Sequence, residues 1–152
     1  MAEIAVTPKT IEDARCLQPL AMLPPRPRFG RDNPGAVEPQ FINFDDVRPF
    51  TLADGVSGRP LFGERGMLNL IEFEPGAVVP LHSHPHEQLG IVLEGMQALV
   101  VDGVAHELTS LQGYVLPGGV EHSAYCGPDG AVVLDVFSPV REDYEQRWQE
   151  GG

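Results

Sequence analysis

Cysteine is scarce in this chain of 152 residues, which contains only two, Cys16 and Cys126. They lie far apart in the sequence and form no Cys-x-x-Cys pair. This spacing argues against a disulfide framework, so we expect two ordinary thiols in a reducing compartment. Cys126 is expected to be a small buried side chain rather than a nucleophile, because nothing nearby would lower the pKa of its thiol.

Basic residues and long apolar runs are also few. Lys and Arg number 10 against 22 Asp and Glu, which gives a net charge of −12. This charge repels nucleic-acid phosphates and anionic lipids, so the sequence predicts no nucleic-acid and no membrane partner. No apolar run approaches the ~20 residues of a membrane-spanning helix, and the N-terminal residues lack the layout of a secretory signal. We therefore expect a cytoplasmic protein.

Composition divides the chain into an N-terminal arm, an all-β domain and a C-terminal helix. Residues 1–40 hold 7 of the 15 prolines, and a short helix followed by a Pro-rich linker is expected there. Residues 41–138 contain short apolar stretches separated by turn residues, which is typical of an antiparallel sandwich or barrel. Asp102-Gly103 predicts a type I′ hairpin. Residues 139–152 are expected to form a short helix and tail, with Tyr144 and Trp148 on one face.

Three of the five histidines stand at alternate positions in PLHSHPHEQ, residues 80–88. Alternate residues of a strand point to the same face, so His82 and His84 are expected to converge. Pro85 is expected to bend the chain and turn His86 toward solvent, and His106 is expected to face solvent as well.

Two further residues complete a candidate metal site. Gln88 begins the next strand and can reach back beside the two imidazoles, and His122 opens a strand far along the chain. We therefore predict one divalent transition metal per chain, with Zn, Ni, Mn and Fe all suited to imidazole and amide donors. The candidate ligands are His82, His84, Gln88 and His122.

Two stretches resemble the two sequence motifs of the cupin family. GAVVPLHSHPHEQLGIVLEG, residues 76–95, resembles the first motif, with Gln88 where glutamate is usual. PGGVEHSAYC, residues 117–126, resembles the second, with Cys126 where asparagine is usual and Leu111 where the preceding glycine is usual. The resemblance covers about residues 60–145. It implies a single-domain cupin fold, a double-stranded β-helix or jelly-roll barrel, and the habit of the family implies a homodimer.

The glutamine in the first motif leaves the whole ligand set neutral. A bound dication then keeps more of its charge for polarising a substrate oxygen, and a higher oxidation state is less well compensated. The sequence therefore favours Lewis-acid chemistry over iron redox chemistry, although neutral three-histidine oxygenases also occur among cupins.

The ending VLDVFSPVREDY, residues 133–144, is similar to that of small cupins that linearise unsaturated uronates from pectin and alginate breakdown. This resemblance implies that Asp135, Phe137 and Arg141 line the substrate pocket and that Asp135 and Arg141 act in catalysis. The residues agree, because a carboxylate on an apolar strand is unfavourable unless it is used, and an arginine can bind a carboxylate. An ion pair between Asp135 and Arg141 without chemistry is an equal alternative. Tyr125 is a candidate pocket wall or an ordinary core residue.

Three functional hypotheses follow from the sequence. The first is a metal-dependent isomerase or lyase of a small carboxylated substrate, such as an unsaturated uronate. The second is an iron-dependent dioxygenase of a small organic molecule. The third is a non-catalytic cupin that binds a metal or another ligand.

Overall fold

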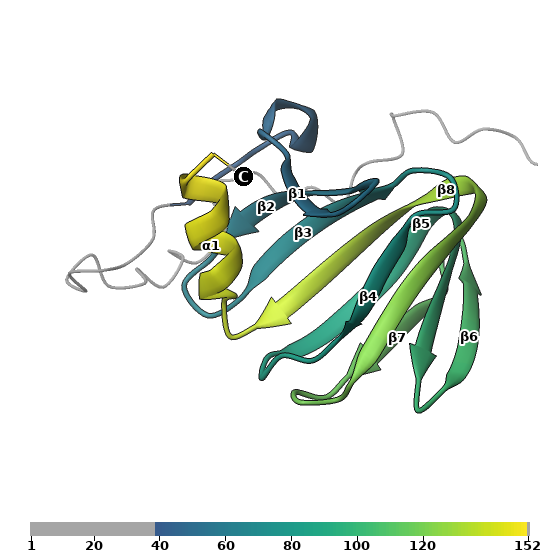
Figure 1. The fold of residues 1–152 in the computed structure, drawn as a ribbon. Helices are drawn as coiled ribbons and strands as arrows, with labels where there is room; N and C mark the ends of the chain where they lie inside the picture. The colour runs from purple at the N-terminus through teal and green to yellow at the C-terminus, as the bar shows by residue number, and fades with distance from the viewer. Residues whose placement is uncertain (1–38, 152) are drawn as a thin grey trace, which may run out of the picture. The chain divides into compact units, whose positions relative to one another are not determined.

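The computed structural model describes residues 39–151, so most of the expectations for the N-terminal arm lie outside the described residues. The described part consists of eight strands and one helix, which confirms the predicted all-β fold with a short C-terminal helix (Figure 1). A short 3-10 helix, η3, precedes the strands (Phe44–Asp46). The strands and the helix are β1 (Phe50–Ala53), β2 (Val56–Phe62), β3 (Met67–Phe73), β4 (Val78–His82), β5 (Glu87–Val101), β6 (Val104–Thr109), β7 (Gly113–Leu116), β8 (His122–Ser138) and α1 (Glu142–Gln149).

Two long strands, β5 and β8, connect the whole sheet. The strand order is β1-β2-β3-β8-β5-β6, while β4 pairs with β8 and β7 pairs with β5. The first half of β8 pairs with β4 and its second half with β3. The first half of β5 likewise pairs with β7 and its second half with β6. Because register shifts at 92–97 bend β5, the two long strands each belong to two layers, as in a jelly roll.

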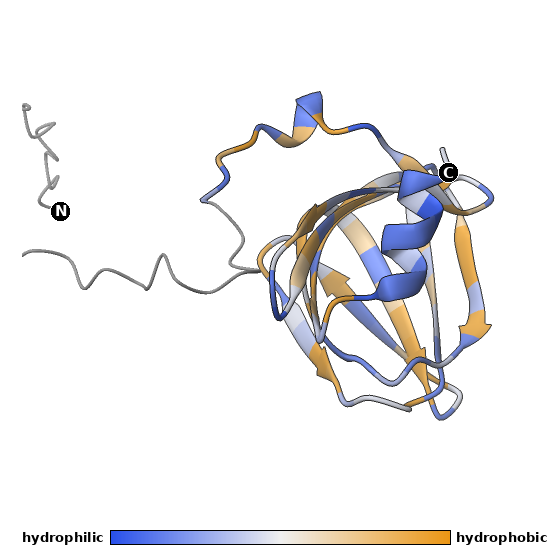
Figure 2. Ribbon diagram, turned by 90° about the vertical axis from the view of Figure 1, so that its left-hand side faces the viewer, coloured by the Kyte–Doolittle hydropathy of each residue, from blue (hydrophilic) through white to orange (hydrophobic). Residues whose placement is uncertain are grey.

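The strands around the interior alternate between buried and partly exposed residues, as a two-faced sheet requires. In β3 the residues at 67, 69, 71 and 73 are buried, and in β8 those at 131, 133, 135 and 137 are buried. Ala131, Val133, Asp135 and Phe137 of β8 therefore share the interior face of the sheet. The hydropathy colouring shows the apolar bands lying on the strands, whereas α1 is mostly hydrophilic (Figure 2).

The hairpin between β5 and β6 has the predicted turn. Asp102 and Gly103 both have positive φ, 52° and 76°, which is the backbone conformation of a type I′ turn. Val101 and Val104 are paired directly beside the turn. The hairpin prediction is confirmed.

The C-terminal helix packs through aromatic side chains but begins later than predicted. It starts at Glu142 rather than near Pro139, because β8 continues to Ser138. Tyr144 packs edge-on against Phe50 and Phe137, with ring centroids 5.3 and 5.7 Å away, and Trp148 packs against Phe62 at 5.8 Å. Within residues 39–151, no helix has the length and apolar character needed to cross a bilayer.

Leu111, in the turn between β6 and β7, has a left-handed backbone. Its φ is 66°, a conformation that is unfavourable for a residue with a Cβ atom, and its side chain is 79% exposed. This is the position at which glycine is usual in the second motif. The turn therefore keeps the backbone that glycine favours while carrying a leucine.

We predict that Leu111→Gly raises the free energy of unfolding by about 1 kcal/mol, because relief of the left-handed strain outweighs the extra freedom of glycine in the unfolded chain. Chemical denaturation measures the change. Leu111→Ala keeps the Cβ atom and serves as the control, for which little gain is expected. Equal stabilisation by both substitutions would show that loss of the exposed apolar side chain, and not backbone strain, is responsible.

Candidate metal centre

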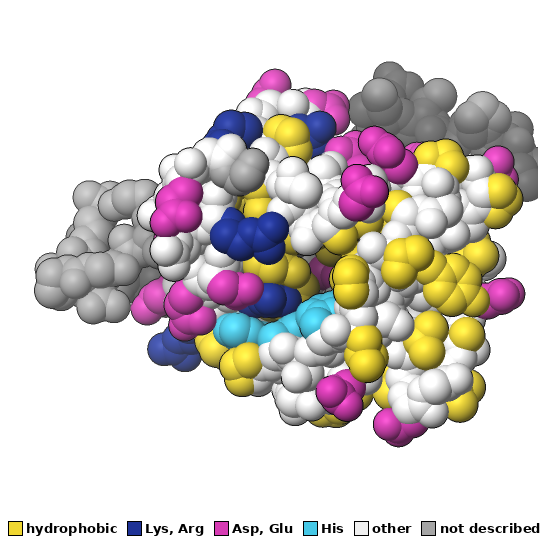
Figure 3. All heavy atoms as spheres, viewed as in Figure 1, with side chains coloured by type: hydrophobic (Ala, Val, Ile, Leu, Met, Phe, Trp, Pro, Cys, Tyr) yellow, Lys and Arg dark blue, Asp and Glu magenta, His cyan; other side chains and the backbone are white. Residues whose placement is uncertain are grey.

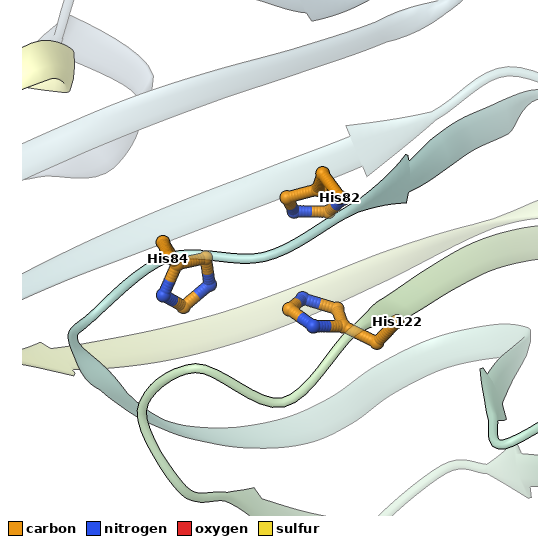
Figure 4. Close-up of side chains that lie close together, drawn as sticks. All are labelled: His82, His84 and His122. Carbon is orange, nitrogen blue, oxygen red and sulfur yellow. The ribbon is translucent and has the colours of Figure 1, made fainter.

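Three of the predicted ligands meet in space. His82 ends β4, His84 follows it, and His122 opens β8, where the strand register sets it opposite His82. The ring centroids of His122 lie 4.4 Å from His82 and 5.2 Å from His84. One ligand nitrogen from each histidine lies within 4.8 Å of the other two. The three rings point toward a common centre (Figure 4).

The hydrogen bonds of the three histidines determine which nitrogen is free. In each case Nδ1 faces a backbone carbonyl oxygen: that of Pro80 for His82 at 2.8 Å, of His86 for His84 at 3.1 Å and of Val120 for His122 at 2.9 Å. Because a carbonyl only accepts, each Nδ1 carries the hydrogen and each Nε2 keeps its lone pair. Three Nε2 lone pairs are thus available, which is the arrangement found in histidine metal sites.

Burial favours the neutral form of two of the three imidazoles, those of His84 and His122. Desolvation lowers the pKa of His84 to about 4, with a further contribution from the positive charge of Arg141, and desolvation also lowers the pKa of His122. A metal binds only the unprotonated imidazole, so these two ligands do not have to lose a proton before a cation binds. The donor set fits a divalent transition metal.

The side chain of Gln88 connects the histidines to a buried carboxylate. Its Nε2 donates to Asp135 Oδ2 at 2.7 Å and to Tyr114 Oη at 3.2 Å. These two bonds turn Oε1 toward the histidines, where it lies 3.1 Å from His84 Nε2. In the tautomer described above both of these atoms are acceptors, so neither supplies a hydrogen to the other. The amide oxygen therefore lies where a fourth donor to a shared cation would lie.

Asp135 is buried, with 2% of its surface exposed, and is held by two donors. Besides the Gln88 amide, the Tyr114 hydroxyl donates to Oδ1 at 2.6 Å. Burial raises the pKa of Asp135 to about 7, against the opposing effect of these hydrogen bonds. The tyrosine hydroxyl itself stays protonated, because burial and the neighbouring carboxylate raise the pKa of Tyr114 well above 10.

Gly90 makes room for this pair. In the register of the sheet it lies between Tyr114 on β7 and Asp135 on β8. A Cβ atom at position 90 would lie 2.4 Å from Tyr114 Oη and 2.5 Å from Asp135 Oδ1. Tyr114 was not predicted from the sequence, because no local spacing connects β7 to β8. The one signal in the sequence is Gly90 itself, because a glycine in the middle of a strand indicates that another group approaches the backbone closely.

Arg141 does not pair with Asp135, so the predicted alternative of an ion pair between them is wrong. Its Nε and Nη2 donate to Asp143 at 3.1 and 2.7 Å. The guanidinium carbon lies 3.8 Å from the ring centre of Tyr144 and 5.3 Å from that of Phe137. The remaining Nη1 is buried and has no hydrogen-bond partner among the described residues. One N–H face of Arg141 is thus left for a ligand.

These groups surround one cavity of about 290 Å³. Its polar wall includes His82, Gln88, Tyr114, His122 and Arg141, and Phe137 adds an aromatic side. Asp135 lies behind this wall, separated from the cavity by Tyr114 and Gln88. On the face of the molecule seen in Figure 3, histidine and arginine side chains gather side by side in a hollow. The cavity has room for a small molecule.

Tyr125, a predicted pocket residue, does not line this cavity. Its neighbours on β8, Ala124 and Cys126, are buried toward the interior, so the alternation of the strand turns Tyr125 to the outer face. The tyrosine of the cavity is Tyr114 instead. The strand of Tyr125 was correctly placed, but the side of the sheet that it faces was not.

The predictions for His86, His106 and Cys126 have different outcomes. His86 is only 6% exposed rather than solvent-facing, because its Nε2 lies 3.3 Å from Glu142 Oε2 at the start of α1. His106 is exposed on β6, as predicted. Cys126 is buried and its thiol donates to the backbone oxygen of Glu74 at 2.9 Å, which confirms a small core side chain.

Comparison with known proteins identifies the domain. Residues 69–137 match the model of the cupin domain. The chain is 33% identical to an RmlC-like cupin of known structure from Shewanella frigidimarina, with a TM-score of 0.65, over 70% of this chain and 96% of that one. It is 28% identical to the pectin degradation protein KdgF of Dickeya dadantii over 66% of this chain and 94% of that protein.

A further relative is the dimethylsulfoniopropionate lyase DddW of Ruegeria pomeroyi. The identity is 34% over 88 residues, which are 57% of this chain. The matched part spans only 55% of the length of that lyase.

We predict that Asp135 makes metal-free protein less stable as the pH rises from about 4 to about 7, against the opposite contribution of His84 and His122, whose lowered pKa values add stability as the pH rises through this range. The native state holds the Asp135 proton up to its raised pKa, whereas the unfolded chain releases it near 3.8. The stability difference is absent below pH 3.8 and complete above pH 7, where it amounts to roughly 4 kcal/mol at most.

Urea unfolding between pH 4 and 8, in the presence of a chelator, measures this dependence. Asp135→Asn removes the Asp135 contribution, so the stability of this variant relative to the wild type is expected to rise with pH, while Asp129→Asn, at an exposed carboxylate, is expected to follow the wild type. A pH profile that Asp135→Asn leaves unchanged would contradict the assignment.

Proposed function

The chain belongs to the cupin family, and on this premise we propose that it is a metal-dependent enzyme that catalyses an isomerase- or lyase-type reaction on a small carboxylated substrate. An unsaturated uronate is the first candidate substrate. One observation carries the proposal. Two of the three converging histidines, the tyrosine whose hydroxyl bonds to a buried carboxylate, and the arginine that has an N–H group without a partner all line one cavity.

His82, His84 and His122, with Gln88 as fourth donor, are the residues that would hold the metal, for which Zn, Ni, Mn and Fe are the candidates. When bound, a divalent cation polarises an oxygen of the substrate and stabilises negative charge on it. The neutrality of the four donors supports this role, because no ligand carboxylate offsets the charge of the cation.

Arg141 is proposed to bind the carboxylate of the substrate. Its guanidinium is held in place by Asp143 on one edge and by the ring of Tyr144 on its face. The edge that carries Nη1 is left for a ligand, and a buried N–H group gains most from an anionic acceptor. A carboxylate bound here would lie beside the wall formed by Tyr114 and Gln88.

Tyr114 and Asp135 are proposed to move the proton. Tyr114 lines the cavity, and its hydroxyl already donates to Asp135 at 2.6 Å. When the tyrosine oxygen accepts a proton from the substrate, its own proton can pass to the carboxylate, and the reverse transfer returns it. A pKa of about 7 for Asp135 suits both directions near neutral pH. The sequence assigned catalysis to Asp135 directly, whereas this geometry supports action through Tyr114.

The comparisons support carboxylate chemistry of two kinds. The similarity to the pectin degradation protein KdgF supports an unsaturated uronate as the substrate, in agreement with the resemblance of residues 133–144. Dimethylsulfoniopropionate, the substrate in the name of the Ruegeria lyase, is the second candidate. It too is a carboxylate. Arg141 and the Tyr114–Asp135 pair would serve both reactions in the same way.

The direct test is turnover of freshly prepared unsaturated galacturonate, followed by NMR, with protein loaded with Zn, Ni, Mn or Fe. We expect the ring form to disappear with loaded protein and to persist with chelated protein. Dimethylsulfoniopropionate is assayed in parallel. Absence of turnover of both substrates would contradict the proposal; ferrous-dependent oxygen uptake would then favour the dioxygenase, and binding without product the non-catalytic alternative.

We predict that Tyr114→Phe lowers kcat by about two orders of magnitude, the usual contribution of a positioned acid–base group, without changing the metal content. Steady-state kinetics together with elemental analysis measures both quantities. Tyr125→Phe, on the outer face of β8, is the matched control and is expected to keep wild-type kcat. If Tyr114→Phe also keeps wild-type kcat, the hydroxyl does not carry the proton.

A further inference from the structure

A second glutamine, Gln97, lines the cavity at the bend of β5. It stands beside one of the two register shifts of this strand and pairs with Leu108 of β6 and Cys126 of β8. Gln97 is buried, with 3% of its surface exposed, and belongs to the cavity wall. Neither the metal ligands nor the proton transfer proposed above involve this residue.

The cavity wall around Gln97 is apolar. Leu99 lies two residues further along β5 on the same face, and its partner on β8 is Ala124. Both line the cavity, together with Ile71 and Phe73 of β3. Among such neighbours a buried amide is unfavourable unless each of its polar atoms finds a partner. The hydrogen bonds of Gln97 therefore decide whether the residue has a structural or a ligand-binding role.

Tyr114 determines which end of the Gln97 amide faces it. The Tyr114 hydroxyl donates its hydrogen to Asp135 at 2.6 Å, so its oxygen can only accept. Burial is the main cause of the raised pKa of Tyr114, and hydrogen bonds from the side chains of Gln88 and Gln97 oppose it. The NH₂ group of Gln97 is therefore the end that faces the hydroxyl. The amide oxygen, Oε1, is the end left over.

Oε1 of Gln97 is buried and has no hydrogen-bond partner within residues 39–151. A buried carbonyl oxygen without a donor destabilises the folded state. Of the five buried side-chain atoms in this condition, two belong to residues that line the cavity, Gln97 Oε1 and Arg141 Nη1. They are of opposite kinds. The Arg141 atom is a donor suited to a carboxylate, whereas the Gln97 atom is an acceptor suited to an O–H or N–H group.

We propose that Gln97 is a specificity residue, whose Oε1 accepts a hydrogen bond from a hydroxyl group of the substrate while Arg141 binds the substrate's carboxylate. This role rests on the proposed function and narrows the substrate to hydroxylated carboxylates. An unsaturated uronate carries hydroxyl groups, whereas dimethylsulfoniopropionate has neither an O–H nor an N–H group. A substrate without such a donor leaves Oε1 unpaired in the closed complex, and a site of this kind discriminates against it.

Titration calorimetry of the Zn-loaded full chain with two probes tests this role. Galacturonate carries hydroxyl groups, whereas tetrahydropyran-2-carboxylate has the same ring and carboxylate without them. We expect the wild type to bind galacturonate at least about tenfold more tightly, because only this probe satisfies Oε1. Gln97→Met removes the acceptor at similar length and is expected to abolish the preference. Gln146→Met, at an exposed position of α1, is the matched control and is expected to keep it.

The melting temperature separates a binding role from a structural one. Gln97→Met removes a buried unpaired oxygen, so its melting temperature is expected to be no lower than that of the wild type. A lower melting temperature together with an equal loss of affinity for both probes would show that Gln97 only supports Tyr114, and would overturn the proposal. Equal affinities of the wild type for the two probes would overturn it as well.

The role of Gln97 and the proposed function can fail separately. A wild type that prefers galacturonate through Gln97 but turns over no substrate would support the role of Gln97 and contradict the proposed function. Turnover of unsaturated galacturonate with a kcat/KM that Gln97→Met leaves unchanged would contradict the role of Gln97 alone.

Discussion

The hydrogen bond from the Gln88 amide to Asp135 is the interaction on which the arrangement of the site depends. The side-chain amide of Gln88 has an NH₂ group that donates and an oxygen that accepts, and the NH₂ group donates to the buried carboxylate of Asp135. The acceptor end is thereby turned to the histidines. A glutamate at position 88 would instead bring a second carboxylate to hydrogen-bonding distance of the first, in a place where burial already opposes one negative charge. Asp135 therefore explains why position 88 carries glutamine rather than the glutamate that is usual in the family.

The same interaction ties the site to the paired long strands. Gln88 and Gly90 belong to β5, while His122, Asp135 and Phe137 belong to β8, and these strands are hydrogen-bonded to each other along their length. The distances between the functional groups are therefore set by sheet register rather than by loops. Residues on strands are held more precisely than residues on loops, which favours chemistry that depends on a proton moving between fixed atoms.

Local patterns in the sequence predicted much of this fold. The alternation of His82 and His84 and the Asp102-Gly103 hairpin each depend on neighbouring residues. The errors concern relations between distant segments. Tyr114 reaches Asp135 across Gly90, Arg141 bonds to Asp143 rather than to Asp135, and His86 is covered by the start of α1. Periodicity cannot give the register of one strand against another, nor can it tell which side of a two-sided apolar strand faces the cavity.

Elemental analysis of protein purified without a metal-affinity tag, with the wild type beside His122→Ala, tests the central claim most directly. The three histidines come from two segments that are distant in sequence and adjacent in the sheet, so removal of His122 breaks the set while His82 and His84 stay in place. The account predicts close to one divalent transition-metal ion per wild-type chain and its loss in the variant. A wild-type protein that holds no metal even after reloading, or a variant that retains it fully, would contradict the account.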